Sequence, residues 1–416
     1  MKDESRQFEQ IFYSILESSG LPDRSLQHGE CQSPGGRRCV LCAASRITYA
    51  PEVVAKEAAL RELWNRIARG TSLEPLIASP LGRGYRTVTK RKAFHARENT
   101  EIGLIDPSER GEGRFDPLWC AIEPTDHGII YGAVRKELAR PEIRPLAEQL
   151  SYVIIKGTYA RMSIMFNVHE IAPGTVKAAN TLSKRLSSVS GKISASFLFE
   201  GDGDDRYYQA IADYRPARSI RKLFGSSNIT VSVSGKHLSY PPLSFAQVNQ
   251  SLLEQLVATA RSLLVLRRGM SLYDLYCGYG LFALTLGDPA RTVVGIERSA
   301  DSVRAARANA HRLGAKNVRF IRGDITAELL ENALENLGGT DAVILDPPRG
   351  GTAKGVPETI TAMRPAKILH LFCNIEIVED DLQRWTSAGY RLSRAVPLDM
   401  FPGTPNVELM LLFERG

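Results

Sequence analysis

The sequence contains no apolar stretch long enough to cross a bilayer, and charged residues interrupt its first twenty positions, where a secretory signal would be apolar. These absences predict a cytoplasmic protein. Cysteine is scarce, with 6 among 416 residues. In a reducing compartment, cysteines are more often metal ligands, catalytic groups or packing residues than disulfides. Internal repeats and low-complexity segments are also lacking, and 43% hydrophobic with 24% charged residues is typical of a folded globular protein.

Positive charge is in moderate excess. The formal net charge is +7 and the sequence pI is about 9.0. Such an excess favours contact with polyanions, because neutralising phosphates releases counterions. It is far smaller than the charge of a histone-like tail, so it permits a nucleic-acid partner without requiring one.

The pattern of apolar residues divides the chain into three parts. Residues 1–45 contain one amphipathic helix, "FEQIFYSILESS", followed by a Gly- and Pro-rich segment with three cysteines. Residues 46–245 open with a second helix and continue in short alternating runs, which predict an antiparallel sheet with a helix or two. Residues 246–416 alternate strictly between strand and helix patterns, which is typical of a doubly wound α/β sheet. We therefore expect an α/β C-terminal domain, an α+β central domain and a small N-terminal segment.

A glycine-rich turn follows the first strand pattern of the C-terminal part. In "DLYCGYGLFALTLG", Gly278 and Gly280 allow a ligand to approach the backbone, at the place where open α/β sheets bind ligands. With Asp274 ahead of it, the stretch resembles the first motif of S-adenosylmethionine-dependent methyltransferases. Glu297 and Asp324 end the next two strands, where they would meet the ribose and the adenine. Taken singly, these two carboxylates are also compatible with a helix N-terminal charge and a cap.

A second set of residues is expected at the same edge of the sheet. In "LDPPRGG" the two prolines end the strand after Asp346, so this carboxylate faces the pocket. The next strand, "KILHLFC", brings Cys373 to the same rim. The alternative for Cys373 is a small buried hydrophobic residue. For Cys277, in the glycine-rich turn, we expect either such packing or a place in the lining of the cofactor pocket.

Five segments together resemble the RNA uracil-5-methyltransferases. They are "FAQVNQ", "DLYCGYGLF", "DPPRGG", the Cys-Asn pair at 373–374 and "DMFPGTPNVELMLL", and they span the C-terminal half. The resemblance implies a Rossmann-like class I methyltransferase domain. It also implies that Cys373 is the nucleophile and Glu408 the general base. The cofactor, S-adenosylmethionine, is expected to contact Gln247, Tyr276, Gly278, Glu297, Asp324 and Asp346.

The chemistry requires this pair of groups. Carbon 5 of uracil is a poor nucleophile, and addition of a thiolate at carbon 6 creates an enolate that can accept a methyl group. A base must then remove the carbon 5 proton, and a carboxyl group in a dry pocket has a suitably raised pKa. The alternative for Glu408 is a solvated residue on an edge strand.

Three positions depart from the usual family pattern. Phe372 precedes the cysteine where relatives commonly have Ser, Ile375 follows the asparagine where they have a small residue, and Asn406 replaces a His. These departures concern the pocket for the base. A small-molecule or nucleoside acceptor is therefore the alternative to RNA.

Four other cysteines form a potential metal site. Cys31, Cys39, Cys42 and Cys120 could hold a [4Fe-4S] cluster or a tetrahedral zinc ion, and the number of ligands does not decide between them. Their spacing resembles the cluster motif of iron-sulfur members of the family that act on 23S ribosomal RNA and lack an N-terminal RNA-binding barrel. This resemblance favours the cluster, with a structural role. The alternative is four unrelated packing residues.

Two basic segments are candidates for RNA contact. Basic residues alternate with Tyr85 and Phe94, a pattern that can follow phosphates and stack bases, although solvated faces would look the same. The target uridine must leave its stack, so a loop or bulge, most readily in ribosomal RNA, is expected. We expect a monomer. An RNA-binding protein without catalysis is the third possibility, disfavoured by the retained Cys and Glu. The basic residues are Arg83, Arg86, Lys90, Arg91, Lys92, Arg97, Arg215, Arg218, Arg221 and Lys222.

Overall fold

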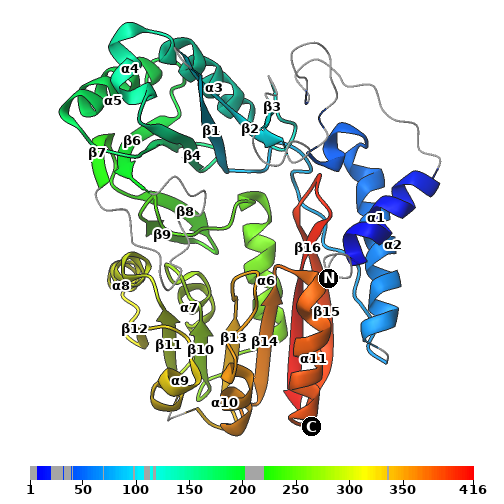
Figure 1. Ribbon diagram of the computed structural model, residues 1–416. Helices are drawn as coiled ribbons and strands as arrows, with labels where there is room; N and C mark the ends of the chain where they lie inside the picture. The colour runs from blue at the N-terminus through cyan, green and yellow to red at the C-terminus, as the bar shows by residue number, and fades with distance from the viewer. Residues whose placement is uncertain are drawn as a thin grey trace.

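The computed structural model shows two sheet-based units, with two N-terminal helices along one side (Figure 1). It describes residues 7–19, 31, 39, 41–68, 70–96, 99–106, 113–115, 119–201, 220–334 and 337–416. Helix α1 spans Gln7–Ser18 and helix α2 spans Tyr49–Ile67. Both correspond to amphipathic patterns in the sequence.

The C-terminal unit is a doubly wound sheet, as predicted. Its strand order is β12-β11-β10-β13-β14-β16-β15, in which the first five strands are parallel and β16 runs antiparallel to both of its neighbours, β14 and β15. The order reverses between β10 and β13, which marks the switch point where such sheets bind ligands. The strands are β10 (Ser271–Leu275), β11 (Thr292–Glu297), β12 (Val318–Arg322), β13 (Ala342–Leu345), β14 (Lys367–Phe372), β15 (Tyr390–Phe401) and β16 (Asn406–Arg415). The helices are α6 (Leu253–Leu264), α7 (Leu281–Leu286), α8 (Ala300–Leu313), α9 (Ala327–Ala333), α10 (Val356–Ala362) and α11 (Val378–Ser387).

The central unit is a second sheet, of order β3-β2-β1-β4-β5-β6-β7. The prediction of an antiparallel sheet is wrong for one pair, since β5 and β6 run parallel. Helix α5 (Pro173–Leu186) connects these two strands, and a helical crossover returns the chain in the same direction. The strands are β1 (Val88–Ala96), β2 (Asn99–Asp106), β3 (Gly113–Phe115), β4 (Leu150–Gly157), β5 (Met162–Val168), β6 (Ile193–Glu200) and β7 (Ile220–Gly225), with α3 (Thr125–Leu138) and α4 (Arg144–Ala147) as further helices.

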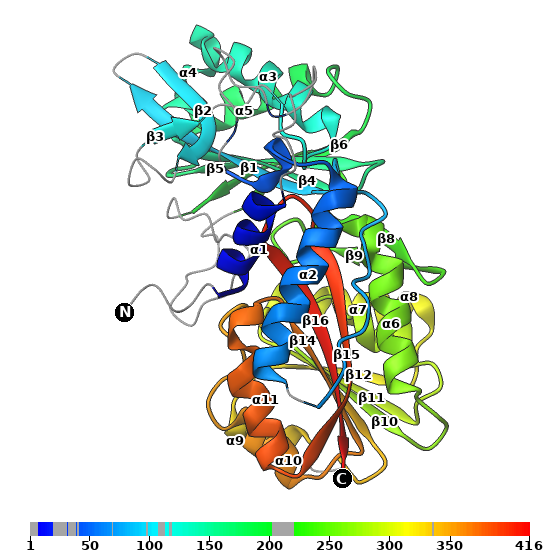
Figure 2. The ribbon, with the colours of Figure 1, turned by 90° about the vertical axis from the view of Figure 1, so that its right-hand side faces the viewer.

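Elements outside 246–416 share the hydrophobic cores of the C-terminal unit. Helix α2 buries Leu60, Leu63 and Trp64 in the same core as β14, β16 and α11. Figure 2 shows this helix running along β15 and β16. The hairpin of β8 (Ile229–Val233) and β9 (Lys236–Tyr240) packs in a second core with α6. The sequence boundaries at 45/46 and 245/246 therefore separate segments that pack together.

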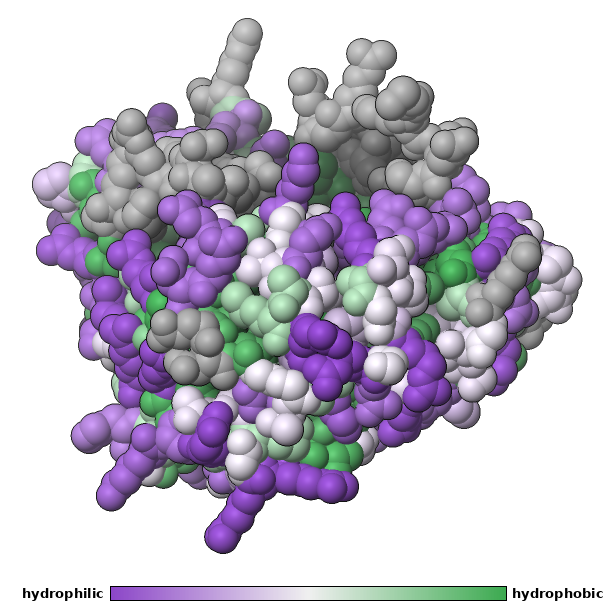
Figure 3. All heavy atoms as spheres, turned by 90° about the horizontal axis from the view of Figure 1, so that it is seen from below, coloured by the Kyte–Doolittle hydropathy of each residue, from purple (hydrophilic) through white to green (hydrophobic). Residues whose placement is uncertain are grey.

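The described helices include none that is both long and apolar enough to span a membrane. Seen from below, the molecule has hydrophilic and hydrophobic residues interspersed over its surface (Figure 3). Isolated exposed hydrophobic residues of this kind are normal on globular proteins.

Candidate active site

The glycine-rich turn after β10 has the backbone conformation that close approach of a ligand requires. Tyr276, Gly278 and Gly280 have φ values of 65°, 53° and 89°. A side chain at Gly280 would also come within 3.1 Å of Phe320, so glycine is needed there for packing as well. A positive φ is uncommon for tyrosine and costs about 1–3 kcal/mol, a strain that is typical of functional loops.

Asp274 lies fully buried beneath this turn. One carboxylate oxygen, Oδ2, accepts a hydrogen bond of 2.7 Å from the Ala283 N–H, while Oδ1 is buried and without a hydrogen-bond partner. Burial raises the pKa of Asp274 to about 8, and the charges of Asp346 and Glu297 act in the same direction. A buried acceptor without a partner suits a ligand that carries an ammonium group, as S-adenosylmethionine does.

Glu297 and Asp324 lie at the ends of neighbouring strands but in different environments. Glu297 accepts hydrogen bonds from the Gly278 N–H (3.1 Å) and the Ser299 N–H (2.6 Å), and burial raises its pKa. These bonds fix the carboxylate beside the glycine-rich turn. Asp324 is 54% exposed and forms a 3.0 Å ion pair with Arg298. Its side chain is therefore engaged on the surface.

Gln247 and Asp346 meet although they are 99 residues apart in the sequence. Gln247 Nε2 donates a hydrogen bond of 3.4 Å to Asp346 Oδ2. Burial raises the pKa of Asp346 to about 7. The segment "FAQVNQ" thus reaches the carboxyl end of β13, where Asp346 was expected.

Cys373 and Glu408 are brought to the same end of two paired strands. Phe372, the last residue of β14, pairs with Leu409 of β16. Cys373, which follows β14, and Glu408 of β16 are therefore neighbours. Burial raises the pKa of Cys373 to about 12, and the nearby charges of Glu408 and Asp346 contribute. Glu408 is 5% exposed, and burial, followed by the charge of Asp346, holds its pKa well above its usual value.

Arg349, within "DPPRGG", is a site residue that the sequence analysis did not single out. Its charge lowers the pKa of both Cys373 and Glu408, and thereby opposes the effect of burial. Its Nη2 donates a hydrogen bond of 2.8 Å to Asn406 Oδ1, and its carbonyl accepts one of 3.2 Å from Asn374 Nδ2. The sequence offered one indication of Arg349, because it lies three residues after Asp346 in the same "DPPRGG" segment.

A cavity of about 520 Å³ opens at Cys373. Arg349 and the β15–β16 turn line part of it, and Glu9 and Tyr13 of α1 line another part. Glu376 holds α1 in place by accepting hydrogen bonds from the Gln7 and Phe8 N–H groups at its N-terminus, at 3.1 and 3.0 Å. No sequence motif indicated that the N-terminal helix would form a wall of this cavity.

The three departures from the family pattern have different positions. Phe372 is 2% exposed, stacks on His370 with ring centroids 3.8 Å apart, and belongs to the hydrophobic core. Ile375 and Asn406 line the cavity. Only the latter two departures therefore affect the shape and polarity of the space beside Cys373.

The four predicted metal-binding cysteines lie near one another. The Cys31 thiol forms hydrogen bonds with the thiols of Cys39 and Cys120, and its sulfur accepts a hydrogen bond of 3.2 Å from the Ala121 N–H. Burial raises the pKa of Cys42 to about 12, with contributions from Cys120 and Cys31. Within the part of the chain that the structure describes, however, no three or more His, Cys, Asp or Glu side chains are arranged to hold a metal ion. Four thiols are nevertheless the donor chemistry of a thiolate-bound metal centre. Cys277 lies in a hydrophobic core, as expected.

Several of the basic residues are not available to RNA. Arg91 is 2% exposed, forms two hydrogen bonds of 2.8 Å with the Glu123 carboxylate and lies 4.3 Å from the Tyr131 ring. Tyr85 is fully buried and cannot stack a base. Arg83 pairs with Glu52. Arg221 and Lys222 are exposed on β7, whereas Arg97, Arg215 and Arg218 lie outside the described residues.

Comparisons with known proteins bear on the family and the fold of this chain. Residues 186–416 match the family model described as tRNA (uracil-5-)-methyltransferase. The chain is 29% identical over 393 residues to the 23S rRNA (uracil(1939)-C(5))-methyltransferase RlmD of Aeromonas salmonicida, covering 91% of this chain and 81% of that relative. It is 38% identical over 183 residues to RlmD of Aliivibrio fischeri, covering 44% of this chain and 41% of the relative.

Among solved structures, the chain is similar to the Pyrococcus abyssi tRNA (uracil-54, C5)-methyltransferase in complex with S-adenosyl-L-homocysteine. The TM-score is 0.66 over 88% of this chain and 84% of the other, at 19% sequence identity. At this identity the similarity establishes the fold.

Proposed function

The chain belongs to the tRNA (uracil-5-)-methyltransferase family, and from this membership we propose that it transfers a methyl group from S-adenosylmethionine to carbon 5 of a uridine in RNA. The observation that supports the proposal is that Cys373 lines a cavity and lies beside Glu408 in the strand register, within the electrostatic influence of Asp346. Ribosomal RNA is the proposed substrate, because relatives that match along most of this chain act on 23S rRNA. We propose the cytoplasm as its location and a monomer as its state.

S-adenosylmethionine, when bound, supplies an electrophilic methyl group. We propose that Asp274, Gly278 and Glu297 hold it at the carboxyl ends of β10 and β11, with Asp346 and Gln247 on the opposite side. Tyr276 and Asp324 complete the proposed contacts. The unpartnered Oδ1 of Asp274 supports this assignment, since binding of an ammonium group would satisfy a buried acceptor.

In the proposed reaction, the Cys373 thiol gives its proton to solvent, and the resulting thiolate forms a bond to carbon 6 of the uracil. The electrons of the carbon 5–carbon 6 double bond move toward the carbonyl oxygen. Carbon 5 then takes the methyl group as the sulfonium–methyl bond breaks, which leaves S-adenosylhomocysteine as the second product. Glu408 then removes the carbon 5 proton, the double bond re-forms, and the sulfur–carbon bond breaks to release the cysteine. Each step uses a group that lies at the same end of the sheet.

Electrostatics support these roles. Burial favours the neutral forms of Cys373 and Glu408, so the site avoids two adjacent negative charges before the substrate enters. The charge of Arg349 lowers the pKa of Cys373, against the effect of burial, and so favours the thiolate needed for attack. A protonated carboxyl group that can release its proton once the pocket is occupied is suited to a general base in a dry site.

We further propose that Cys31, Cys39, Cys42 and Cys120 bind a [4Fe-4S] cluster, with zinc as the alternative. The chemistry of four thiols, and the contacts of Cys31 with Cys39 and with Cys120, support a shared metal centre. Its role would be structural. The Ala43 N–H, next to Cys42, donates a hydrogen bond of 2.7 Å to the Gly403 carbonyl in the β15–β16 turn. A metal that fixed the position of Cys42 would therefore also help to fix this turn, which lines the cavity.

The test is incubation of anaerobically purified protein with S-adenosylmethionine and unmodified 23S rRNA, followed by mass spectrometry of the nucleosides. We expect 5-methyluridine with wild-type protein and none with Cys373→Ala. Free uridine is assayed in parallel, because Ile375 and Asn406 alter the cavity. Methylation of the nucleoside but not of RNA would overturn the RNA proposal in favour of a small-molecule acceptor.

A further inference from the structure

The turn between β15 and β16 is enclosed on two sides. Gly403 donates its N–H to Glu52 Oε1 of α2, and its carbonyl accepts from the Ala43 N–H. Its φ is +85°, and a Cβ at this position would lie 2.9 Å from side-chain atoms of both Ala44 and Ile122. The turn is therefore held in one position, between α2 and the residues that follow Cys42 and Cys120.

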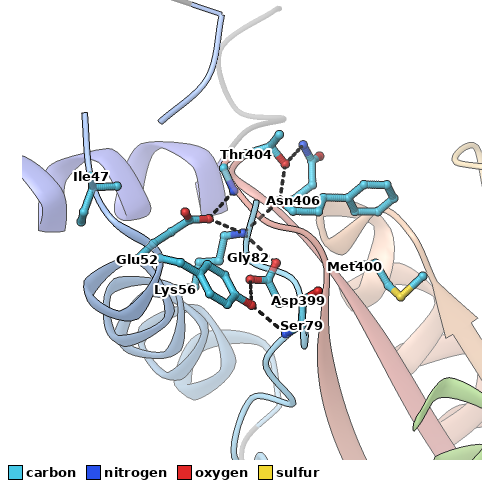
Figure 4. A network of polar contacts seen from close by, with 12 residues as sticks. Ile47, Glu52, Lys56, Ser79, Gly82, Asp399, Met400, Thr404 and Asn406 are labelled. Atoms are coloured by element: carbon cyan, nitrogen blue, oxygen red, sulfur yellow. Dashed lines mark hydrogen bonds and ion pairs between the residues drawn. The ribbon is translucent and has the colours of Figure 1, made fainter. Parts of the chain in front are cut away.

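A buried charge network fixes the start of the same turn. Lys56 Nζ lies 2.7 Å from Asp399 Oδ1 and 3.0 Å from Glu52 Oε1, and it donates a hydrogen bond of 3.1 Å to the Phe401 carbonyl. Figure 4 shows Lys56 reaching from α2 between the two carboxylates. Arg83 pairs with Glu52 Oε2 at 2.8 Å, so two carboxylates are balanced by two cations. Glu52, Lys56 and Asp399 are all completely buried.

Such a network is a poor means of adding stability. Removing charges from water is costly, and well-packed hydrophobic residues would join a helix to a strand at least as firmly. The charged groups instead form directional hydrogen bonds with the turn. Glu52 accepts from the Gly403 N–H, and Lys56 donates to the Phe401 carbonyl. A hydrophobic contact could not fix those backbone groups.

Hydrogen bonds continue from this turn to the candidate active site. The Phe401 carbonyl, held by Lys56, also accepts a bond of 2.9 Å from Thr404 Oγ1. Thr404 Oγ1 accepts a bond of 3.1 Å from Asn406 Nδ2, and Asn406 Oδ1 in turn accepts one of 2.8 Å from Arg349. Two residues beyond Asn406 is Glu408.

We propose that Glu52 and Lys56 are positioning residues that hold the β15–β16 turn so that Asn406, Arg349 and Glu408 have the geometry that methyl transfer requires. This inference rests on the proposed function. It assigns to α2, about 350 residues before the turn in sequence, a role in catalysis that acts through the turn and without contact to the substrate. A displacement of about 1 Å at a reacting group can cost about 100-fold in rate, so a small shift of the turn should be measurable.

The experiment compares Glu52→Ala, Glu52→Gln and the double variant Glu52→Gln/Lys56→Met with Glu62→Ala. Glu62 is a matched control, because it lies on the same helix and pairs with Arg66 at the surface, where its side chain is 49% exposed. The double variant removes one charge of each sign and so avoids leaving an unbalanced buried charge if a single variant fails to fold. Each protein is assayed for kcat, for KM of S-adenosylmethionine and RNA, and for deuterium exchange of residues 399–410.

We expect Glu52→Ala to lower kcat roughly 10- to 100-fold, with KM values within about twofold of wild type and faster exchange in 399–410. Glu52→Gln should recover part of the loss, because its amide oxygen can still accept from Gly403. The control should match wild type. A kcat at the control's level in the folded variants, or a loss confined to KM, would overturn the positioning role. If wild type itself methylates no uridine, the proposed function fails instead.

Discussion

Replacing Arg349 by glutamine tests the electrostatics of the site. The change removes a positive charge that lowers the pKa of Cys373, while glutamine can still donate a hydrogen bond to Asn406. With the pKa of Cys373 at about 12, roughly one thiol in 10⁴ is ionised at pH 8 in the free protein. Each further pKa unit lowers that fraction about tenfold. Removing the charge of Arg349 should raise the pKa of Cys373 by about one unit, so we expect Arg349→Gln to slow thiolate attack about tenfold.

The sign of the pH dependence follows from the same values. Because the thiolate reacts and its pKa lies above the working range, the rate of attack should rise about tenfold per pH unit between pH 7 and 9. The log-rate line of Arg349→Gln should run parallel to that of wild type and below it. Arg349→Lys should restore most of the rate, because it restores the charge.

The assay is single-turnover formation of a covalent complex with RNA containing 5-fluorouridine, measured across this pH range. Arg391→Gln is the control, since Arg391 is an exposed arginine on β15. Rates of Arg349→Gln equal to those of wild type, or rates independent of pH in both proteins, would refute the electrostatic argument.

Three further perturbations test other parts of the site. Glu408→Gln should accumulate a covalent complex with ordinary uridine RNA, because the carbon 5 proton cannot be removed; gel electrophoresis under denaturing conditions detects it, and continued turnover would contradict the general-base role. Cys120→Ser should lower both the iron content and the thermal midpoint of anaerobically purified protein, and unchanged values would argue against the cluster. Asp274→Asn should weaken binding of S-adenosylmethionine in calorimetry. It should also raise the thermal midpoint of the ligand-free protein at pH 8 but not at pH 4. The reason is that the raised pKa of Asp274, about 8, means that stability is complete below about pH 4 and is lost as pH rises toward 8. A lower midpoint at pH 8 would contradict the assignment.

The sequence predicted the C-terminal fold well because each strand and helix there has its own local pattern. "DAVILDPP" and "KILHLFC" are short apolar runs that end in turn residues, and they became β13 and β14. The central sheet was harder. The parallel pairing of β5 with β6 depends on the crossover of α5, which no residue of either strand encodes.

In the candidate site too, residues in local sequence patterns could be predicted, whereas contacts between distant segments could not. Asp346 and Cys373 were candidates because each follows a strand pattern, and Glu408 was a candidate because its segment resembles a family motif. The contributions of Glu9 and Tyr13 were not, since they depend on docking of α1 against Glu376, 368 residues away from Phe8. Arg91 was misjudged for a related reason. Its partner Glu123 is 32 positions distant, and only tertiary packing converts a basic residue in a basic run into a buried ion pair.

The most direct test of the central claim is mass spectrometry of the peptide containing Cys373 after reaction with S-adenosylmethionine and RNA made with 5-fluorouridine, in which the final proton abstraction is blocked. We expect a methylated fluorouridine nucleotide attached to Cys373, and no such adduct in Cys373→Ala. A wild-type peptide that stays unmodified while S-adenosylmethionine demonstrably binds would contradict the nucleophilic role of Cys373.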